Sequence, residues 1–247
     1  MTLFVARPAI PWYLLVLIGL ILFTGQFLLM FLAFRHGLPP GLASVTQQTH
    51  VFLTVLLAAV LFGERPTARQ GAGMVLAAAG LVLIGLTVGA DLPALALALA
   101  LSAALSWAAG SLLLKHVRGV PMFPLIAWCS LVPPLPMLLL SALWGEASLP
   151  AAVAGASWVS LGGALFLGAA TSAYAIWGGL LGRYPAAAVA PFALLSPVTG
   201  VVVSALVFGE RFTSLRYAGM ALILAGLAVI VLRMPKRTVI PLVPRME

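Results

Sequence analysis

The stretch Phe62–Arg65 reads FGER and closes an apolar run that begins at Gly41. The same four letters return at Phe208–Arg211, in the second half of the chain. The offset between the two copies also relates three further pairs: Thr67 with Thr213, Gly73 with Gly219, and Gly80 with Gly226. The chain therefore contains two copies of a helix–turn–helix unit, and this duplication decides the predicted fold.

Composition places the duplicated unit in a membrane. The chain is 63% hydrophobic and 7% charged, so most helix-length windows lack the polar face of a water-exposed helix. The apolar runs are continuous and do not alternate as lipid-facing strands do, which favours an all-α integral membrane protein. The net charge of +8 then indicates topology rather than nucleic-acid binding. With one cysteine, Cys129, we expect no disulfide, metal or other cofactor.

A helix needs about 20 apolar residues to cross roughly 30 Å of hydrocarbon, and this length divides the chain into predicted spans. We predict eight transmembrane helices, at 12–34, 42–62, 68–86, 92–114, 124–144, 158–181, 186–208 and 215–232. If the N-terminus is cytoplasmic, only Arg35, Arg211 and Arg216 of the 13 basic residues face the other side. The positive-inside rule therefore favours that orientation in the cytoplasmic (inner) membrane, with a basic cytoplasmic tail at 233–247.

In this topology the two FGER copies face opposite sides of the membrane, which predicts an inverted repeat. Secondary transporters place their substrate path between such halves. The predicted repeats are unequal, since residues 1–86 supply three spans and residues 92–232 supply five. A five-plus-five arrangement would be symmetric, so we predict an incomplete, three-plus-five bundle.

Several short motifs resemble those of the EamA-type exporters of the drug/metabolite transporter (DMT) superfamily. They are Phe4–Pro8, Gly41–Ser44, the pair Gln47-Gln48, Phe62–Arg65, Ser106–Ala108, Trp177-Gly178 and Leu180–Tyr184. The resemblance implies a DMT-like bundle around a central cavity, alternating access, and export of small metabolites such as amino acids or cysteine-pathway compounds. Family members have ten spans, and Phe4–Pro8 resembles the end of the second. The resemblance thus implies that the first two spans are lacking, and a truncated, non-transporting remnant or membrane assembly partner is the alternative.

Polar residues inside predicted spans are the candidate substrate contacts. Gln47, Gln48 and His50 lie one to two turns inside the span 42–62, where polar side chains usually mark a pathway. Hydrogen bonding between helices is the alternative interpretation. By the same reasoning we predict substrate contacts at a wider set: Gln26, Ser106, Trp107, Thr171, Tyr174 and Trp177. His50 is the only histidine well inside a span and could carry a proton, so proton coupling is a further hypothesis.

Proline and glycine positions predict helix geometry. Pro191 and Pro197 interrupt one span and are candidate gating residues, because each removes an intrahelical hydrogen bond. Gly73 and Gly80 lie two turns apart, as do their repeat counterparts Gly219 and Gly226, so we predict that these two helices pack closely.

No enzyme motif competes with the transporter interpretation. The chain has three dispersed histidines and one cysteine, and it lacks the His-Glu-x-x-His, Gly-x-Ser-x-Gly and phosphate-loop patterns. We therefore expect a monomeric transporter, not an enzyme, whose partners are a small-molecule substrate, membrane lipid and, under the coupling hypothesis, protons. A cavity of amides, hydroxyls, imidazole and aromatic rings suits a small zwitterion.

Overall fold

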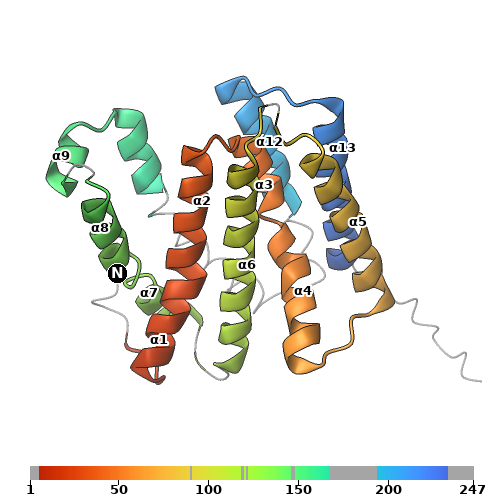
Figure 1. The fold of residues 1–247 in the computed structure, drawn as a ribbon. Coiled ribbons are helices and arrows are strands. Elements are labelled where there is room, and N and C mark those ends of the chain that lie inside the picture. The colour runs from red at the N-terminus through yellow and green to blue at the C-terminus, as the bar shows by residue number, and fades with distance from the viewer. Residues whose placement is uncertain are drawn as a thin grey trace, which may run out of the picture.

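The computed structural model describes residues 6–89, 91–117, 120, 122–145, 148–166, 168 and 194–232. Across these residues the regular structure is helical apart from a single bridge between Val88 and Leu92. Figure 1 shows the main helices standing side by side as a bundle, with α6 near its middle. The apolar runs thus fold as the helices that the sequence predicts.

Six helices of the described part are long and apolar enough to cross a membrane. They run over Trp12–Arg35, Pro40–Phe62, Ala68–Gly85, Ala94–Leu114, Met122–Leu143 and Ser214–Val231. Their bounds lie within about two residues of the predicted ones. The predicted spans 158–181 and 186–208 fall partly outside the described residues, so the eight-helix count of the repeat stays a prediction.

The first two spans are each interrupted, which the sequence analysis did not predict. The first consists of α1 (Trp12–Ile18), the π-helix η2 (Gly19–Gly25) and α2 (Gln26–Arg35). The second consists of α3 (Pro40–Thr46) and α4 (Thr49–Phe62), separated by a turn at Gln47 and Gln48. Both interruptions coincide with residues proposed above as substrate contacts.

Two helices, α5 (Ala68–Gly85) and α13 (Ser214–Val231), form the most extensive helix pair of the described part. Gly80 faces the backbone of Gly219, and Gly73 faces that of Gly226. A Cβ at Gly80 would lie 2.5 Å from Gly219 O, and one at Gly226 would lie 2.5 Å from Gly73 O. The backbones therefore approach as closely as two helices can, and side chains larger than hydrogen do not fit between them.

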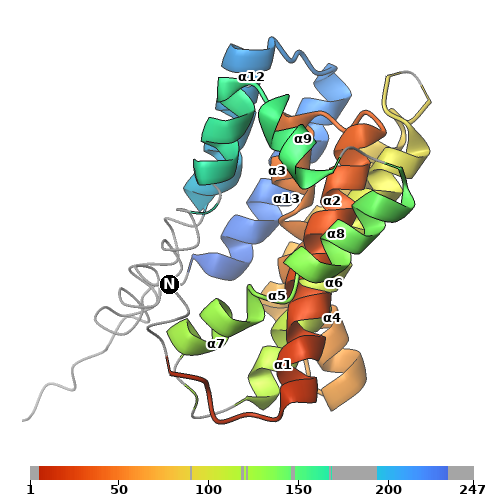
Figure 2. The ribbon, with the colours of Figure 1, turned by 90° about the vertical axis from the view of Figure 1, so that its left-hand side faces the viewer.

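The remaining helices are the long central helix α6 and several shorter ones. They are α6 (Ala94–His116), α7 (Met122–Cys129), α8 (Pro134–Leu143), α9 (Leu149–Ala154), a helix over 158–166, and α12 (Leu195–Phe208). The break between α7 and α8 coincides with Pro133 and Pro134, because proline removes an intrahelical hydrogen bond. Figure 2 shows α8 and α9 on the outside of the first span.

The two FGER turns lie at opposite ends of the bundle (Figure 1). Gly63 follows the end of α4, whereas Glu210 contacts the start of α3, at the other end of the same span. The backbone N–H of Gly41 donates to Glu210 Oε2 at 3.0 Å, so this carboxylate caps the first turn of α3. We call the two ends of the bundle the Glu64 end and the Glu210 end.

An ion pair between the buried Arg216 and the exposed Asp91 closes the Glu210 end. Arg216, in the first turn of α13, is 1% exposed and donates to both carboxylate oxygens of Asp91, with Nη1 2.9 Å from Oδ2. Its Nε also donates to Thr87 Oγ1 at 2.8 Å. The guanidinium lowers the pKa of the Asp91 carboxyl below its ordinary value. The pair fixes α13 to the loop between α5 and α6.

The glycine contact gives a first prediction, for the variant Gly80→Ala. The added methyl group meets the backbone of Gly219, so we expect a loss of about 1–3 kcal/mol in the free energy of unfolding. Gly71 lies in the same helix with nothing within 4 Å of its Cβ position, and Gly71→Ala is the matched control. Because alanine favours helix over glycine, this control should melt no lower than the wild type. Thermal melting in detergent, followed by size-exclusion chromatography, compares the two variants. Equal melting temperatures of Gly80→Ala and Gly71→Ala would contradict the close contact between Gly80 and Gly219.

The ion pair gives a second prediction, for Asp91→Asn. Since the folded-state pKa of Asp91 is lowered, its stabilising contribution is complete above its unfolded pKa and is lost as the pH falls through the lowered folded value. We expect Asp91→Asn to melt below the wild type by a constant amount between about pH 7 and 5, with the difference shrinking only below about pH 4. Melting curves across this range test it, and a difference that disappears already by about pH 6 would contradict it.

Candidate functional site

The turn at Gln47 and Gln48 places polar groups in the middle of the second span. There the backbone tightens, and the N–H groups of His50 and Val51 bond three residues back, to Gln47 O and Gln48 O, at 3.1 Å each. His50 Nδ1 also lies 2.7 Å from Gln47 O. The imidazole is therefore oriented by the carbonyl group at the helix break.

His50 contacts the central helix α6 through Trp107. The two ring centroids are 5.9 Å apart and the planes meet at 70°, an edge-to-face arrangement. This contact joins two of the residues that the sequence selected from separate spans. The edge of one ring meets the face of the other, so the pair places a polar imidazole and an indole between α4 and α6.

Ser106, the neighbour of Trp107, faces the first span instead. Its hydroxyl donates to Ile21 O at 2.6 Å, within the π-helix η2, rather than to its own helix. A Cβ at Gly25 would lie 2.5 Å from the Ser106 hydroxyl oxygen, so glycine at this position lets the two helices meet. π-helical turns are frequent at functional sites, and this one ends directly before Gln26.

Two amide oxygens near these interruptions lack partners among the described residues. Gln26 is 7% exposed, and its Oε1 accepts no hydrogen bond from the described residues. Gln47 Oε1 is likewise buried without a donor there. A buried amide oxygen left without a donor costs about 1–3 kcal/mol, which a bound ligand or water would recover. Gln48 lies in the same turn and begins α4.

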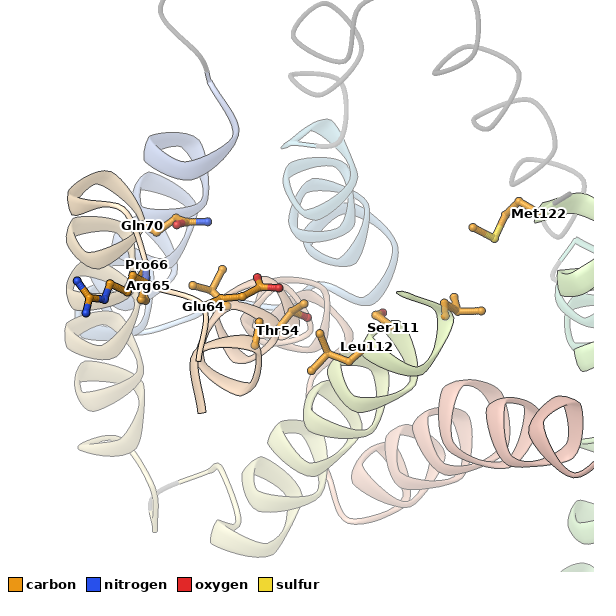
Figure 3. Close-up of a pocket in the computed structure, with 11 residues that line it drawn as sticks. Thr54, Glu64, Arg65, Pro66, Gln70, Ser111, Leu112 and Met122 are labelled. Carbon is orange, nitrogen blue, oxygen red and sulfur yellow. The ribbon is translucent and has the colours of Figure 1, made fainter. Parts of the chain in front are cut away.

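A cavity of about 500 Å³ opens at the Glu64 end (Figure 3). Its walls come from the inner parts of α4 and α6 and from the turn before α5, and its lining includes Thr54, Glu64, Arg65, Gln70 and Ser111. Thr54 lies one helical turn from His50, and Ser111 one turn from Trp107. Two lining residues of the cavity are therefore each one helical turn from a ring of the imidazole and indole pair.

Comparison with known proteins identifies the family. Residues 1–86 and 94–232 match the model of the EamA-like transporter family. This chain belongs to the EamA-like transporter family. It is 39% identical over 235 residues to a probable amino-acid metabolite efflux pump of Salmonella typhimurium, a match that covers 92% of this chain and 79% of that protein.

Two further comparisons agree with this membership. A probable amino-acid metabolite efflux pump of Escherichia coli is 37% identical over the same 92% of this chain and 79% of its own length. A solved structure described as "Crystal structure of protein" superposes with a TM-score of 0.59 at 22% identity, covering 91% of this chain and 77% of that one, which shows the fold alone. The EamA-like chain is thus a multi-pass membrane transporter, not an enzyme, as the sequence analysis predicted.

Several predicted site residues lie outside the described residues of this EamA-like transporter. They are Thr171, Tyr174, Trp177 and the candidate gating residue Pro191. Pro197 is described; it is buried in the first turn of α12, where its carbonyl accepts from Ser44 Oγ at 3.2 Å. The roles of these residues stay predictions.

The structure also reveals site features that the sequence analysis missed. It did not select Thr54 and Ser111 as substrate contacts, although each is a hydroxyl one turn beyond a selected residue. Spacing along the helices could have found them. Among the described residues, no group of three or more His, Cys, Asp or Glu side chains could hold a metal ion.

The unpartnered amide of Gln26 gives a third prediction, for Gln26→Met. Methionine has nearly the same shape and no unmet acceptor, so we expect the free energy of unfolding to rise by about 1–2 kcal/mol while transport falls. Thr46 is also fully buried, but its hydroxyl already donates to Leu42 O at 3.0 Å, so Thr46→Val is the control and should gain no stability. Detergent melting and vesicle transport are measured on both; a Gln26→Met protein less stable than the wild type would contradict the assignment.

Proposed function

We propose that this transporter exports small polar metabolites, amino acids or their derivatives, across the cytoplasmic membrane by alternating access. The observation that carries the proposal is the contact of His50 with Trp107, one helical turn from Thr54 and Ser111, which line the cavity. The relatives described as probable amino-acid metabolite efflux pumps support the same substrate class. In the topology favoured by the basic residues, the Glu64 end and the C-terminus are cytoplasmic.

The polar groups along this path favour zwitterions over strongly charged ions. Among the described residues of α2, α4 and α6, the path offers the amides of Gln26 and Gln47, the imidazole of His50 and the indole of Trp107. None of these groups carries a fixed negative charge. Amides both donate and accept, so they can bind an ammonium and a carboxylate at once.

The helix interruptions give alternating access a physical basis. α3 is a seven-residue segment set off from α4 by the tightened turn at Gln47 and Gln48, so it can tilt without moving α4. On its other side, α3 packs against α12, where Ser44 faces Gly200 and the Pro197 carbonyl. We propose Pro197, with Pro191, as the gating residues of this contact. An inverted repeat, acting as a monomer, would supply the matching movement from the second half.

Proton coupling through His50 is a second element of the proposal. His50 is oriented by a backbone carbonyl and lies on the path, one turn from the cavity. A histidine so placed could take up a proton at one side and release it at the other during a transport cycle.

These proposals give a fourth prediction, for Trp107→Leu and His50→Gln. We expect Trp107→Leu to lower uptake of amino acids by inside-out vesicles at least about tenfold, the equivalent of about 1.4 kcal/mol. His50→Gln should abolish uptake driven by a pH gradient but keep substrate exchange between the two sides. Uptake of labelled amino acids, with and without the gradient, measures both effects.

Matched controls exist for both substitutions. Trp158 is 89% exposed on the helix 158–166, and His36 is exposed after α2, so Trp158→Leu and His36→Gln should transport like the wild type. Unchanged uptake by Trp107→Leu would refute the path. Gradient-driven uptake that survives in His50→Gln would refute the coupling role alone.

A further inference from the structure

The contact of α3 with α12 includes a hydrogen bond that holds the first turn of α3. Pro39 and Pro40 carry no backbone N–H, so Gly41 supplies the first N–H of this helix. That N–H donates to Glu210 Oε2 at 3.0 Å. Because the acceptor is an ionised carboxylate, the bond is about twice as strong as one between neutral groups. Glu210 therefore fastens α3 to the turn between α12 and α13.

Three side chains meet at the first turn of α3. A Cβ at Gly41 would lie 2.9 Å from Glu210 Oε2 and 3.2 Å from Ser204 Cβ. It would lie 3.3 Å from Phe212 Cε2, and the Phe212 ring is held edge to face against Tyr217, with the centroids 5.7 Å apart. The carboxylate, the serine and the aromatic ring thus enclose one point of α3, and the ring shields the hydrogen bond from water.

Ser204 has the opposite effect on this contact. Its side chain is 2% exposed, and its hydroxyl oxygen has no hydrogen-bond partner among the described residues. Ser44, on the other side of the same contact, differs because its hydroxyl donates to Gly41 O at 2.8 Å. A buried hydroxyl without a partner is destabilising, whereas a hydroxyl in water keeps its hydrogen bonds. Since Ser204 lies against Gly41, separation of α3 from α12 would relieve this destabilisation.

We propose that Glu210 and Ser204 act in opposite directions on one gate, which is the contact of α3 with α12. Glu210 stabilises the closed gate, and Ser204 destabilises it. Figure 1 shows the two helices side by side at the Glu210 end. The two effects partly offset each other, so the contact can open and close during a transport cycle. The inference rests on the proposed export function in one respect: this gate is the outlet of the substrate path.

Hydrogen–deuterium exchange of α3 tests the gate without any substrate. The full chain in phosphatidylcholine nanodiscs is labelled, digested and followed by mass spectrometry of the peptide that covers residues 41–46, whose amides exchange when the contact opens. Glu210→Ala removes the acceptor of the Gly41 N–H, so we expect exchange at least about tenfold faster. Ser204→Ala removes the unmet hydroxyl, so we expect exchange at least about fivefold slower.

Matched variants and an internal reference accompany these two substitutions. Ser196 is exposed on α12, and Arg211 is exposed directly after Glu210, so Ser196→Ala and Arg211→Ala should exchange like the wild type. Glu210→Gln keeps a neutral acceptor and should exchange at a rate between those of the wild type and Glu210→Ala. Peptides from α5 should be unchanged in every variant, because its glycine contacts with α13 do not involve Glu210 or Ser204.

The outcomes separate the gate from the export function. Shifts of Glu210→Ala and Ser204→Ala in the same direction, or unchanged exchange of α3 in both variants, overturn the gate. Export is measured separately as uptake of labelled amino acids by inside-out vesicles, where Ser204→Ala should be slower than the wild type. A Ser204→Ala protein that exchanges slowly but transports like the wild type overturns the role of this contact as an outlet.

Two further results distinguish failure of one proposal from failure of the other. Opposite exchange shifts, together with no amino-acid uptake by the wild type, overturn export and leave the opposed action of Glu210 and Ser204 standing. Uptake by the wild type, together with equal exchange of α3 in Glu210→Ala and Ser204→Ala, overturns the gate and leaves export standing.

Discussion

The structure depends on one constraint: backbone N–H and C=O groups inside a membrane must find partners within the protein. Regular helices meet this condition by themselves, and each interruption needs a replacement partner. At η2 the Ser106 hydroxyl donates to Ile21 O. At the turn before α4 the Thr49 hydroxyl donates to Thr46 O, and the His50 imidazole lies against Gln47 O, which also accepts from the His50 backbone N–H. Each interruption thus brings a polar side chain into the bundle. The polar path and the irregular backbone have the same physical origin.

The bundle divides into a closely packed helix pair, α5 with α13, and the helices that we propose line the substrate path. α5 and α13 meet through glycines along their length, and their ends are tied by Arg216 to Asp91 and by Arg69 Nε to Val229 O. None of these contacts involves the interrupted helices. The contact of α3 with α12 differs, because it uses small groups, a serine facing a glycine, and one carboxylate on a backbone N–H. Such a contact has few bonds to break when α3 tilts, whereas movement of α5 against α13 would force backbones into each other.

Local patterns in the sequence predicted much of this fold. The ends of six spans lie close to their predicted positions. The π-helix was not predicted, because an all-apolar helix has no polar face whose periodicity could reveal a shifted register. The pairing of Arg216 with Asp91 was also missed, since the two residues are distant in sequence and only the packing of α13 on α5 brings them together. The sequence showed which polar residues lie deep inside a predicted span. It did not show which residues their side chains contact in the fold.

The two copies of the repeated unit make different contacts at the start of their second helices, α5 and α13. Thr67 and Thr213 cap α5 and α13 in the same way, each accepting from the backbone N–H three residues on. At that third position the copies differ: Gln70 bonds back to Thr67 and lines the cavity, whereas Arg216 reaches across to Asp91 and Thr87. The Glu64 end is therefore hollow, and the Glu210 end is held by an ion pair and by Glu210 on Gly41. Of these two contacts only the bond to Gly41 involves α3, so the proposed tilt of α3 would release that bond and leave the Arg216 pair intact.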